Sequence, residues 1–267
     1  MNSELSNVFI IGSPRSGTSA LGWALAQHPD LWTSAETDIL LYLLQKPWFH
    51  EQYKKALAEP NKKNWFIKHT VSYPEFASFI GSGLNQLFQS RSDGKIFVDS
   101  TPSYTTIAAE LMIFFPNAKF LHIVRDGRAV VNSMLASGFS YKTYNNFRLA
   151  CKSWVYYVNK GLEIEKAFPD RVLEVRNENL ISYPEKELDF VFDFLGMESS
   201  TESAIFLRTK RVNSSYLNVQ KDDIRKAKDP ALMPNKPWKS WSRSKRFLFT
   251  RIAGETMNKL EYGIDFE

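Results

Sequence analysis

The sequence predicts an α/β fold in which helices flank a central parallel sheet. Two continuous apolar runs, at 8–11 and 120–124, are typical of strands that are covered on both faces. Each run leads through a short loop into a helical pattern, and strands that alternate with helices build parallel sheets. With 267 residues and 43% hydrophobic content, the chain can bury a sizeable core. We therefore expect one domain over residues 1–267.

The first unit holds a glycine-rich loop between the strand at 8–11 and a helix that should end near Gln27. Gly12 and Gly17 permit the backbone conformations of a sharp turn, and Pro14 fixes one dihedral angle. The free N–H groups of such a loop and of the first helical turn point at one spot. With the helix dipole they form a binding site for a phosphate.

The spacing of Gly12 and Gly17 is that of a phosphate-binding loop. Thr18 stands where nucleotide triphosphatases carry a lysine, so we expect a nucleotide with a shorter phosphate chain than ATP. Arg15 can reach a phosphate or a transferring group. A glycine-rich turn without a ligand is the alternative. The predicted anion-binding residues are Arg15, Ser16, Gly17, Thr18 and Ser19.

Residues 30–38 are expected to form a loop that returns to the strand ends. Glu36 and Asp38 lie in this loop, and a carboxylate at that place can serve as a general base. An exposed carboxylate without such a role is the alternative.

The segment 39–90 is predicted to be helical, with breaks at Pro47, Pro60 and Pro74. We expect it to shape a substrate pocket. Its aromatic side chains are expected mainly in the core, because aromatic rings bury large apolar areas. They are Tyr42, Trp48, Phe49, Tyr53, Trp65, Phe66, Tyr73, Phe76 and Phe79.

A further strand is predicted at 95–98, followed by a polar loop at 99–104 and a helix at 105–115. The loop lies at the carboxyl end of its strand, where ligands bind in open α/β sheets. It is therefore expected near the ligand.

The second informative unit is the strand at 120–124 with the helix that follows it. Arg125 lies at the strand end, and a helical rise of about 1.5 Å per residue puts Ser133 roughly two turns along. Arg125 and Ser133 can hold one phosphate between them. Asp126 is a candidate N-cap, and Arg128 is a candidate surface or ion-pair residue.

The rest of the chain is predicted as helix 144–168, strand 171–175, helix 183–195 and helix 244–260. The last helix is expected to pack against the sheet. The stretch 208–243 is basic and rich in Pro, Ser and Asn, which is typical of a loop. Lys239 in this loop is a candidate phosphate contact, and a solvated cation is the alternative.

The formal net charge is +5, and the Lys and Arg residues are scattered. A solvated face explains such a pattern, so no nucleic-acid partner is expected. The single cysteine, Cys151, excludes an intramolecular disulfide and suits a reducing compartment. The polar start MNSELSN is no signal peptide, and no apolar run is long enough to cross a membrane. A cytoplasmic protein is expected.

Two stretches carry a family resemblance. GSPRSGTS at 12–19 resembles the 5′-phosphosulfate loop of sulfotransferases, and VRDGRAVVNS at 124–133 resembles their 3′-phosphate motif. The residues of these motifs are similar to those of the tyrosylprotein sulfotransferase branch and bacterial relatives. The stretches HPDLWTSAET, FPNAKFLHIVRDGRA and KLEYG show the same similarity. The resemblance implies a P-loop-like sulfotransferase fold and 3′-phosphoadenosine 5′-phosphosulfate (PAPS) as co-substrate, with no metal. It also implies transfer of the sulfuryl group to an acceptor hydroxyl or amine.

The resemblance suggests roles for single residues. Glu36 matches the general base of the tyrosylprotein branch, and Ser214 matches a serine offered to the reacting group. Arg15 is then placed to act on the leaving phosphate. Three positions differ: Ser100 replaces a catalytic lysine of many sulfotransferases, Asn177 a tyrosine near the nucleotide, and Ser137 an arginine of the tyrosylprotein branch.

The acceptor is left open by these residues, since phenols, alcohols, sugars, lipids and peptides all fit. Two other functions are alternatives. A phosphate-loop kinase would bind ATP with magnesium, but the loop lacks the lysine for it. A non-catalytic module that binds 3′-phosphoadenosine 5′-phosphate (PAP) or nucleic acid would explain the basic charge but would leave Glu36 unused.

Overall fold

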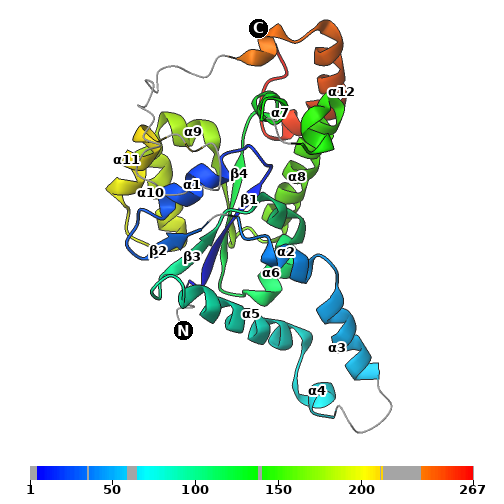
Figure 1. Cartoon of the computed structure of the whole chain (residues 1–267), viewed down its shortest axis with the longest axis vertical. Coiled ribbons are helices and arrows are strands. Elements are labelled where there is room, and N and C mark those ends of the chain that lie inside the picture. The colour runs from blue at the N-terminus through cyan, green and yellow to red at the C-terminus, as the bar shows by residue number, and fades with distance from the viewer. Residues whose placement is uncertain are drawn as a thin grey trace.

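The computed structural model describes residues 5–34, 36–58, 65–137, 140–210, 212 and 236–266. In this part of the chain, five parallel strands form one sheet in the order β2-β3-β1-β4-β5 (Figure 1). Helices cover both faces, so the predicted α/β class is confirmed. The strands are β1 (Asn7–Gly12), β2 (Leu31–Thr33), β3 (Ile96–Asp99), β4 (Lys119–Val124) and β5 (Val172–Arg176).

Strand β1 lies at the middle of the sheet, and all of its residues are buried. Its side chains alternate between the two faces. Val8 and Ile10 join one core cluster, whereas Phe9 and Ile11 join the other. The continuous apolar run in the sequence therefore reflects a strand that is covered on both sides.

The strand register brings three carboxyl ends together. Phe9 of β1 pairs with Asp99 of β3, and Gly12 of β1 pairs with Ile123 of β4. The loops that follow β3, β1 and β4 therefore lie side by side at one edge of the sheet. Ligands of open parallel sheets bind at this edge.

Two groups of helices bury the two faces of the sheet. On one face, Pro184 begins α10 and the left-handed Gly196 (φ 73°) ends it, close to the predicted bounds 183–195. The helices of this face are α1 (Thr18–Leu25), α9 (Asn177–Ser182), α10 (Pro184–Leu195) and α11 (Thr201–Thr209). The opposite face is covered by α2 (Ile39–Leu44), α5 (Tyr73–Gln89), η2 (Pro102–Ile107) and α6 (Ala108–Phe114).

A third core cluster joins α7 (Gly127–Leu135), α8 (Phe147–Ala167) and α12 (Arg243–Lys259), beyond the end of β4 (Figure 1). The rings of Trp154 on α8 and Phe249 on α12 stack at 6.4 Å between centroids. The expectation that the last helix packs against the sheet is thus wrong, because it packs on α8 instead. Among the described helices, none combines the length and the apolar character needed to cross a bilayer.

Two short elements differ from the prediction. The expected loop 30–38 contains β2, a three-residue strand that pairs with β3 at the edge of the sheet. Three residues are too few to show an alternating pattern. The helix expected at 105–115 is preceded by the 3₁₀ turns of η2, and its α-helical part is α6.

The helices α3 (Trp48–Ala58) and α4 (Trp65–Thr70) extend away from the sheet (Figure 1). The expectation of a mainly buried aromatic set is wrong here. Tyr42, Trp48 and Phe79 are 78%, 57% and 80% exposed. Among the residues that the structure describes, no further layer covers this segment, so its rings pack against one another only in part. The half-buried members are Phe49, Tyr53, Tyr73 and Phe76, and the side chains of Trp65 and Phe66 lie outside the described residues.

Candidate active site

The glycine-rich loop joins β1 to α1 in a strained, tightly packed turn. Gly12 (φ 142°) and Gly17 (φ 107°) have positive φ, and so does Arg15 between them (φ 70°). A Cβ at Gly12 would overlap the carbonyl oxygen of Ile123, and a Cβ at Gly17 would overlap the amide of Asn177. Both positions therefore require glycine.

The start of α1 offers N–H groups to an anion. Gly17 is its N-cap and provides no side-chain hydrogen bond to the first turn. Arg15 and Ser19 are partly exposed, whereas Ser16 and Thr18 are buried. The Ser16 amide donates to the Ser13 carbonyl oxygen at 3.1 Å. The side-chain hydroxyl of Ser16 is buried and has no hydrogen-bond partner among the described residues.

The two sequence motifs meet in space. The Nε of Arg15, in the first motif, donates to Oγ of Ser133, in the second, at 3.2 Å. The Nη1 of Arg125 donates to the carbonyl oxygen of Arg15 at 3.0 Å. Burial lowers the pKa of the Arg125 guanidinium, although the nearby Glu178 carboxylate opposes this shift. Two arginines and a serine hydroxyl thus lie together beside the anion-binding turn.

An ionic network fixes the start of α7; it confirms Asp126 as the N-cap and Arg128 as an ion-pair residue, and it adds Glu178 and Tyr262, which were not predicted. Asp126 caps the helix by accepting from the Arg128 amide at 2.8 Å, and the two side chains form an ion pair at 2.7 Å. Glu178 of α9 accepts from the Asp126 amide at 3.0 Å and from the Tyr262 hydroxyl at 2.6 Å. Burial and the Glu178 carboxylate raise the pKa of Tyr262. These partners are far apart in the sequence, so no local pattern predicts the network. Tyr262 lies in KLEYG, one of the stretches that carry the family resemblance.

Glu36 lies on the β3 side of β1, whereas Arg125 and Ser133 lie on the β4 side. Thr37, the next residue, is hydrogen-bonded to the end of β3. The Thr37 hydroxyl donates to Oδ2 of Asp99 at 2.8 Å, and the Thr37 amide donates to Oγ1 of Thr101 at 3.1 Å. The amide and hydroxyl of Thr101 both donate to Oδ1 of Asp99, at 3.0 and 2.6 Å. Burial raises the pKa of Asp99 to about 6 in spite of these donors.

Two tyrosines that the sequence analysis did not assign to the site lie near Glu36. Burial raises the pKa of Tyr144, while the charge of Arg15 opposes the rise and the charge of Glu36 adds to it. Burial also raises the pKa of Tyr157 to about 12, with contributions from neighbouring tyrosines and the carboxylates of Asp38 and Glu36. Tyr144 therefore lies within the electric field of both the loop arginine and the candidate base.

The three positions that depart from the family resemblance, Ser100, Asn177 and Ser137, pack against or bond to neighbouring residues. Ser100 is buried against α1, where a Cβ on Gly22 would lie 3.0 Å from the Ser100 Cβ. Asn177 packs against Gly17, and the Ser137 hydroxyl donates to the Met134 carbonyl oxygen at 2.7 Å. Ser100 and Gly22 of α1 therefore pack closely against each other.

Two residues of the prediction lie elsewhere. Lys239 is exposed in η4 (Pro237–Ser240), which packs beside α7, the helix that carries Ser133. Its carbonyl oxygen accepts from Arg246 at 2.5 Å. Ser214 lies outside the described residues. The contacts of both with a ligand stay predictions.

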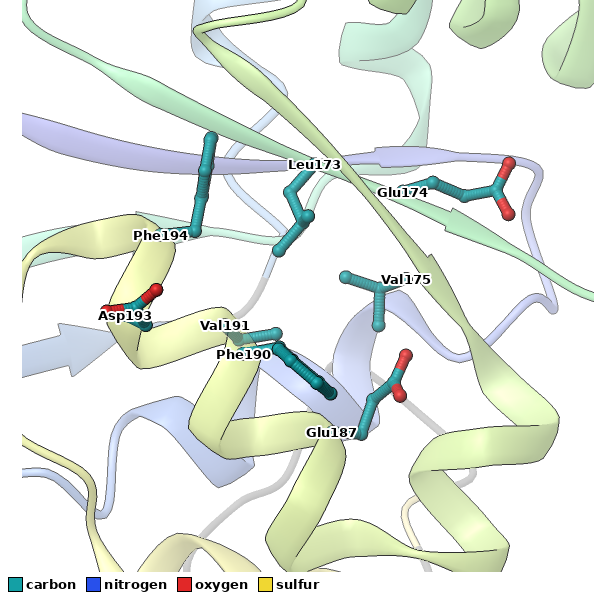
Figure 2. A pocket seen from close by; sticks show the side chains of 8 residues that line it. All are labelled: Leu173, Glu174, Val175, Glu187, Phe190, Val191, Asp193 and Phe194. Atoms are coloured by element: carbon teal, nitrogen blue, oxygen red, sulfur yellow. The ribbon is translucent and has the colours of Figure 1, made fainter.

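A cavity of about 370 Å³ lies between β5 and α10 (Figure 2). Leu173 and Val175 of β5 and Phe190 and Val191 of α10 line it, together with carboxylates such as Glu187. None of its lining residues was predicted for the site. This cavity does not include Arg15, Arg125 or Ser133, which lie together at the strand ends.

Comparisons with known proteins agree with the geometry. The model of the Sulfotransferase family matches residues 7–202. Protein-tyrosine sulfotransferase A of Caenorhabditis elegans is 28% identical over 196 residues, which cover 70% of this chain and 49% of that protein. The chain spans about half the length of the curated relatives that it matches.

Two solved structures share the fold. The sulfotransferase domain from the Synechococcus PCC 7002 olefin synthase superposes with a TM-score of 0.63 at 22% identity, covering 94% of both chains. Mouse sulfotransferase SULT7A1 complexed with PAP superposes with a TM-score of 0.51 at 15% identity, covering 94% of this chain and 84% of that one. The sheet and its helices are therefore those of the P-loop-like sulfotransferase fold.

Proposed function

The chain belongs to the sulfotransferase family, and we propose that it transfers the sulfuryl group of PAPS to an acceptor hydroxyl or amine. The observation that carries the proposal is the meeting of Arg15, Ser133 and Arg125 beside the turn that begins α1. The group supports two anionic contacts, as a nucleotide with phosphates at both ends of its ribose requires. Glu36 lies across β1 from this group, in a loop tied to β3.

The donor supplies an activated sulfuryl group on its 5′-phosphate. We assign the 5′ side to the loop residues Arg15 to Ser19 and the 3′-phosphate to Arg125 and Ser133, with Lys239 as an outer contact. The loop N–H groups, together with the helix dipole of α1, favour the negative charge of such a ligand. A helix N-terminus and two arginines suit this donor without a metal ion.

In the proposed reaction, the bond between sulfur and the 5′-phosphate oxygen breaks as a bond from the acceptor oxygen to sulfur forms. Glu36 takes the acceptor's proton, and the products are a sulfate ester and PAP. The Arg15 guanidinium and the loop amides stabilise the charge that develops on the bridging oxygen. Ser214 is proposed to contact the transferred group. Since Ser100 cannot supply a cation, Arg15 carries this role.

We propose a phenolic hydroxyl as the acceptor group. Several curated relatives that align with more than two thirds of this chain are named protein-tyrosine sulfotransferases, and a phenol is the group that their name implies. Tyr144 and Tyr157 beside Glu36 offer aromatic surface to such a ring.

Ligand-induced thermal shift tests the donor. A ligand at about 100 times its Kd adds about 2.7 kcal/mol to the free energy of unfolding, which raises the melting temperature measurably. We expect PAP to raise it at concentrations at which ATP with Mg²⁺ and a short oligonucleotide do not. A larger shift with ATP and Mg²⁺ would favour the kinase, and a larger shift with the oligonucleotide would favour a nucleic-acid module.

The first prediction concerns the base. Glu36→Gln should lower turnover of a phenol by about 10²-fold or more, the usual scale for loss of a general base, with PAP affinity nearly unchanged. Turnover is followed with labelled PAPS and affinity by calorimetry. Glu198→Gln, an exposed glutamate after α10, is the matched control and should match the wild type. Wild-type turnover in Glu36→Gln would contradict the assignment.

A further inference from the structure

A cavity of about 440 Å³ lies between α2, η2, α6 and α8. Polar side chains line much of it: Gln45, Ser103, Thr106, Glu110, Tyr156 and Tyr157. Its volume is in the range of sites that bind small molecules. Among the described lining residues, Glu110 alone carries a formal charge, and no Lys or Arg is present.

One end of this cavity lies beside the loop that carries the candidate base Glu36. The Ser103 hydroxyl donates to Oδ1 of Asp38 at 3.0 Å, and Asp38 is two residues after Glu36. Tyr157, which lines the same cavity, lies within the field of both carboxylates. An acceptor in the cavity can therefore direct its hydroxyl toward Glu36.

The other end of the cavity is defined by Glu110. Glu110, in α6, is seven residues after Ser103, in η2. The helical rise over these seven residues is at most about 12 Å, so the two residues are separated by about this distance along the helix axes. Burial, with the Glu110 carboxylate as the second cause, raises the pKa of Tyr73 at the start of α5. The helix α6, which carries Glu110, also packs against α5, so Glu110 lies toward α5. A phenol with a short side chain can span this distance.

We propose, on the basis of the function proposed above, that this cavity is the acceptor site and that it selects a phenol with a positively charged amino group. Three carboxylates, Glu36, Asp38 and Glu110, give this side of the site a negative field. The cations Arg15 and Arg125 lie beside the phosphate loop, where the donor binds. An anionic acceptor would meet repulsion here, whereas an ammonium group can pair with Glu110. The rings of Tyr156 and Tyr157, 5.7 Å apart, add surfaces that attract cations.

Three phenols that differ only in charge test the proposal: tyramine (cationic), tyrosol (neutral) and 4-hydroxyphenylacetate (anionic). With PAPS as donor, kcat/KM should fall in that order. Glu110 is exposed to solvent, so Glu110→Gln should lower the preference for tyramine over tyrosol by roughly twofold to fivefold, the scale of one exposed ion pair. Glu198→Gln, outside the cavity, should change neither the preference for tyramine over tyrosol nor the kcat/KM for tyrosol.

Binding of the same phenols to the protein, measured by calorimetry with PAP added, separates this proposal from the proposed reaction. If no phenol is sulfated but tyramine binds more tightly than 4-hydroxyphenylacetate and this preference shrinks in Glu110→Gln, the site stands and the reaction fails. The proposal is overturned if 4-hydroxyphenylacetate is preferred in binding. It is equally overturned if Glu110→Gln leaves the ratio of tyramine to tyrosol unchanged in both measurements.

Discussion

At the scale of single residues, Asp99 is a carboxyl group whose protonation is coupled to folding. It is 2% exposed, and burial raises its pKa from 3.8 to about 6. The folded protein therefore binds this proton more tightly than the unfolded chain does. The resulting stabilisation is complete below about pH 4 and is lost as the pH rises through about 6. The difference corresponds to about 3 kcal/mol, as an order of magnitude.

Asp99→Asn should remove this pH dependence. Its oxygen can still accept from Thr101, and its amide can donate to the Thr37 hydroxyl, as a protonated Asp99 would. We expect the free energy of unfolding of the wild type to fall by up to about 3 kcal/mol relative to Asp99→Asn between about pH 4 and pH 7. Urea unfolding at several pH values measures the free energy of unfolding of both proteins. If the two free energies change with pH in the same way, Asp99 has an ordinary pKa.

Arg125 and Ser133 separate the expected donor from nucleotides without a 3′-phosphate. Arg125→Ala should weaken PAP by about 10- to 150-fold, the scale of a lost charge-assisted hydrogen bond. AMP should be weakened much less, and only through the lost support of the Arg15 carbonyl. Ser133→Ala should reduce the preference for PAP by a smaller factor.

Calorimetric titration of PAP and AMP into the variants tests this prediction. Arg251→Ala, which removes an exposed cation of α12, is the control for net charge. Equal weakening of PAP and AMP in Arg125→Ala would mean that Arg125 serves the loop and not the 3′-phosphate.

At the scale of elements, the packing of α8 on β4 depends on one residue without a side chain. Gly161 of α8 lies directly over the His122 ring of β4, and a Cβ there would overlap it. His122 is fully buried, and its Nδ1 is 3.2 Å from Oε2 of Glu165, one turn further along α8. The ring cannot move aside without breaking this contact. Helix and strand therefore approach only as closely as glycine allows.

Gly161→Ala should lower the free energy of unfolding by about 1 to 3 kcal/mol, the usual cost of overpacking a core. Alanine favours a helix by about 1 kcal/mol over glycine, so the overlap must exceed this gain. Gly83→Ala on α5 is the matched control, because its Cβ would meet no atom within 4 Å. It should stabilise the protein. Urea unfolding measures both variants. If Gly161→Ala is stabilised as much as Gly83→Ala, Gly161 is not in close contact with the His122 ring.

At the scale of the whole molecule, the layered architecture could be predicted from the sequence because parallel strands show apolar runs. Strands β1, β3, β4 and β5 lie within a residue or two of their predicted places. Strand β2 and the exposed rings of Tyr42, Trp48 and Phe79 were not predicted. A short edge strand has no period, and hydrophobicity does not say whether a further layer exists to cover a helix.

The site was predictable where its residues are contiguous in the chain. The loop at 12–19 and the stretch 124–133 carry their spacing within a few residues. The contacts of Asp99 with Thr37 and of Glu178 with Tyr262 join residues more than sixty positions apart. Tyr144 and Tyr157 lie beside Glu36 only through the tertiary fold. No local pattern reveals such pairs.

The central place of β1 in the sheet bears on how a protein of this kind diversifies. The predicted donor contacts follow β1 and β4, whereas Glu36 follows β2 and the cavity beside its loop is lined by α2, η2, α6 and α8. We therefore expect acceptor choice to drift rapidly among descendants of such a chain, while the demand for one nucleotide changes slowly.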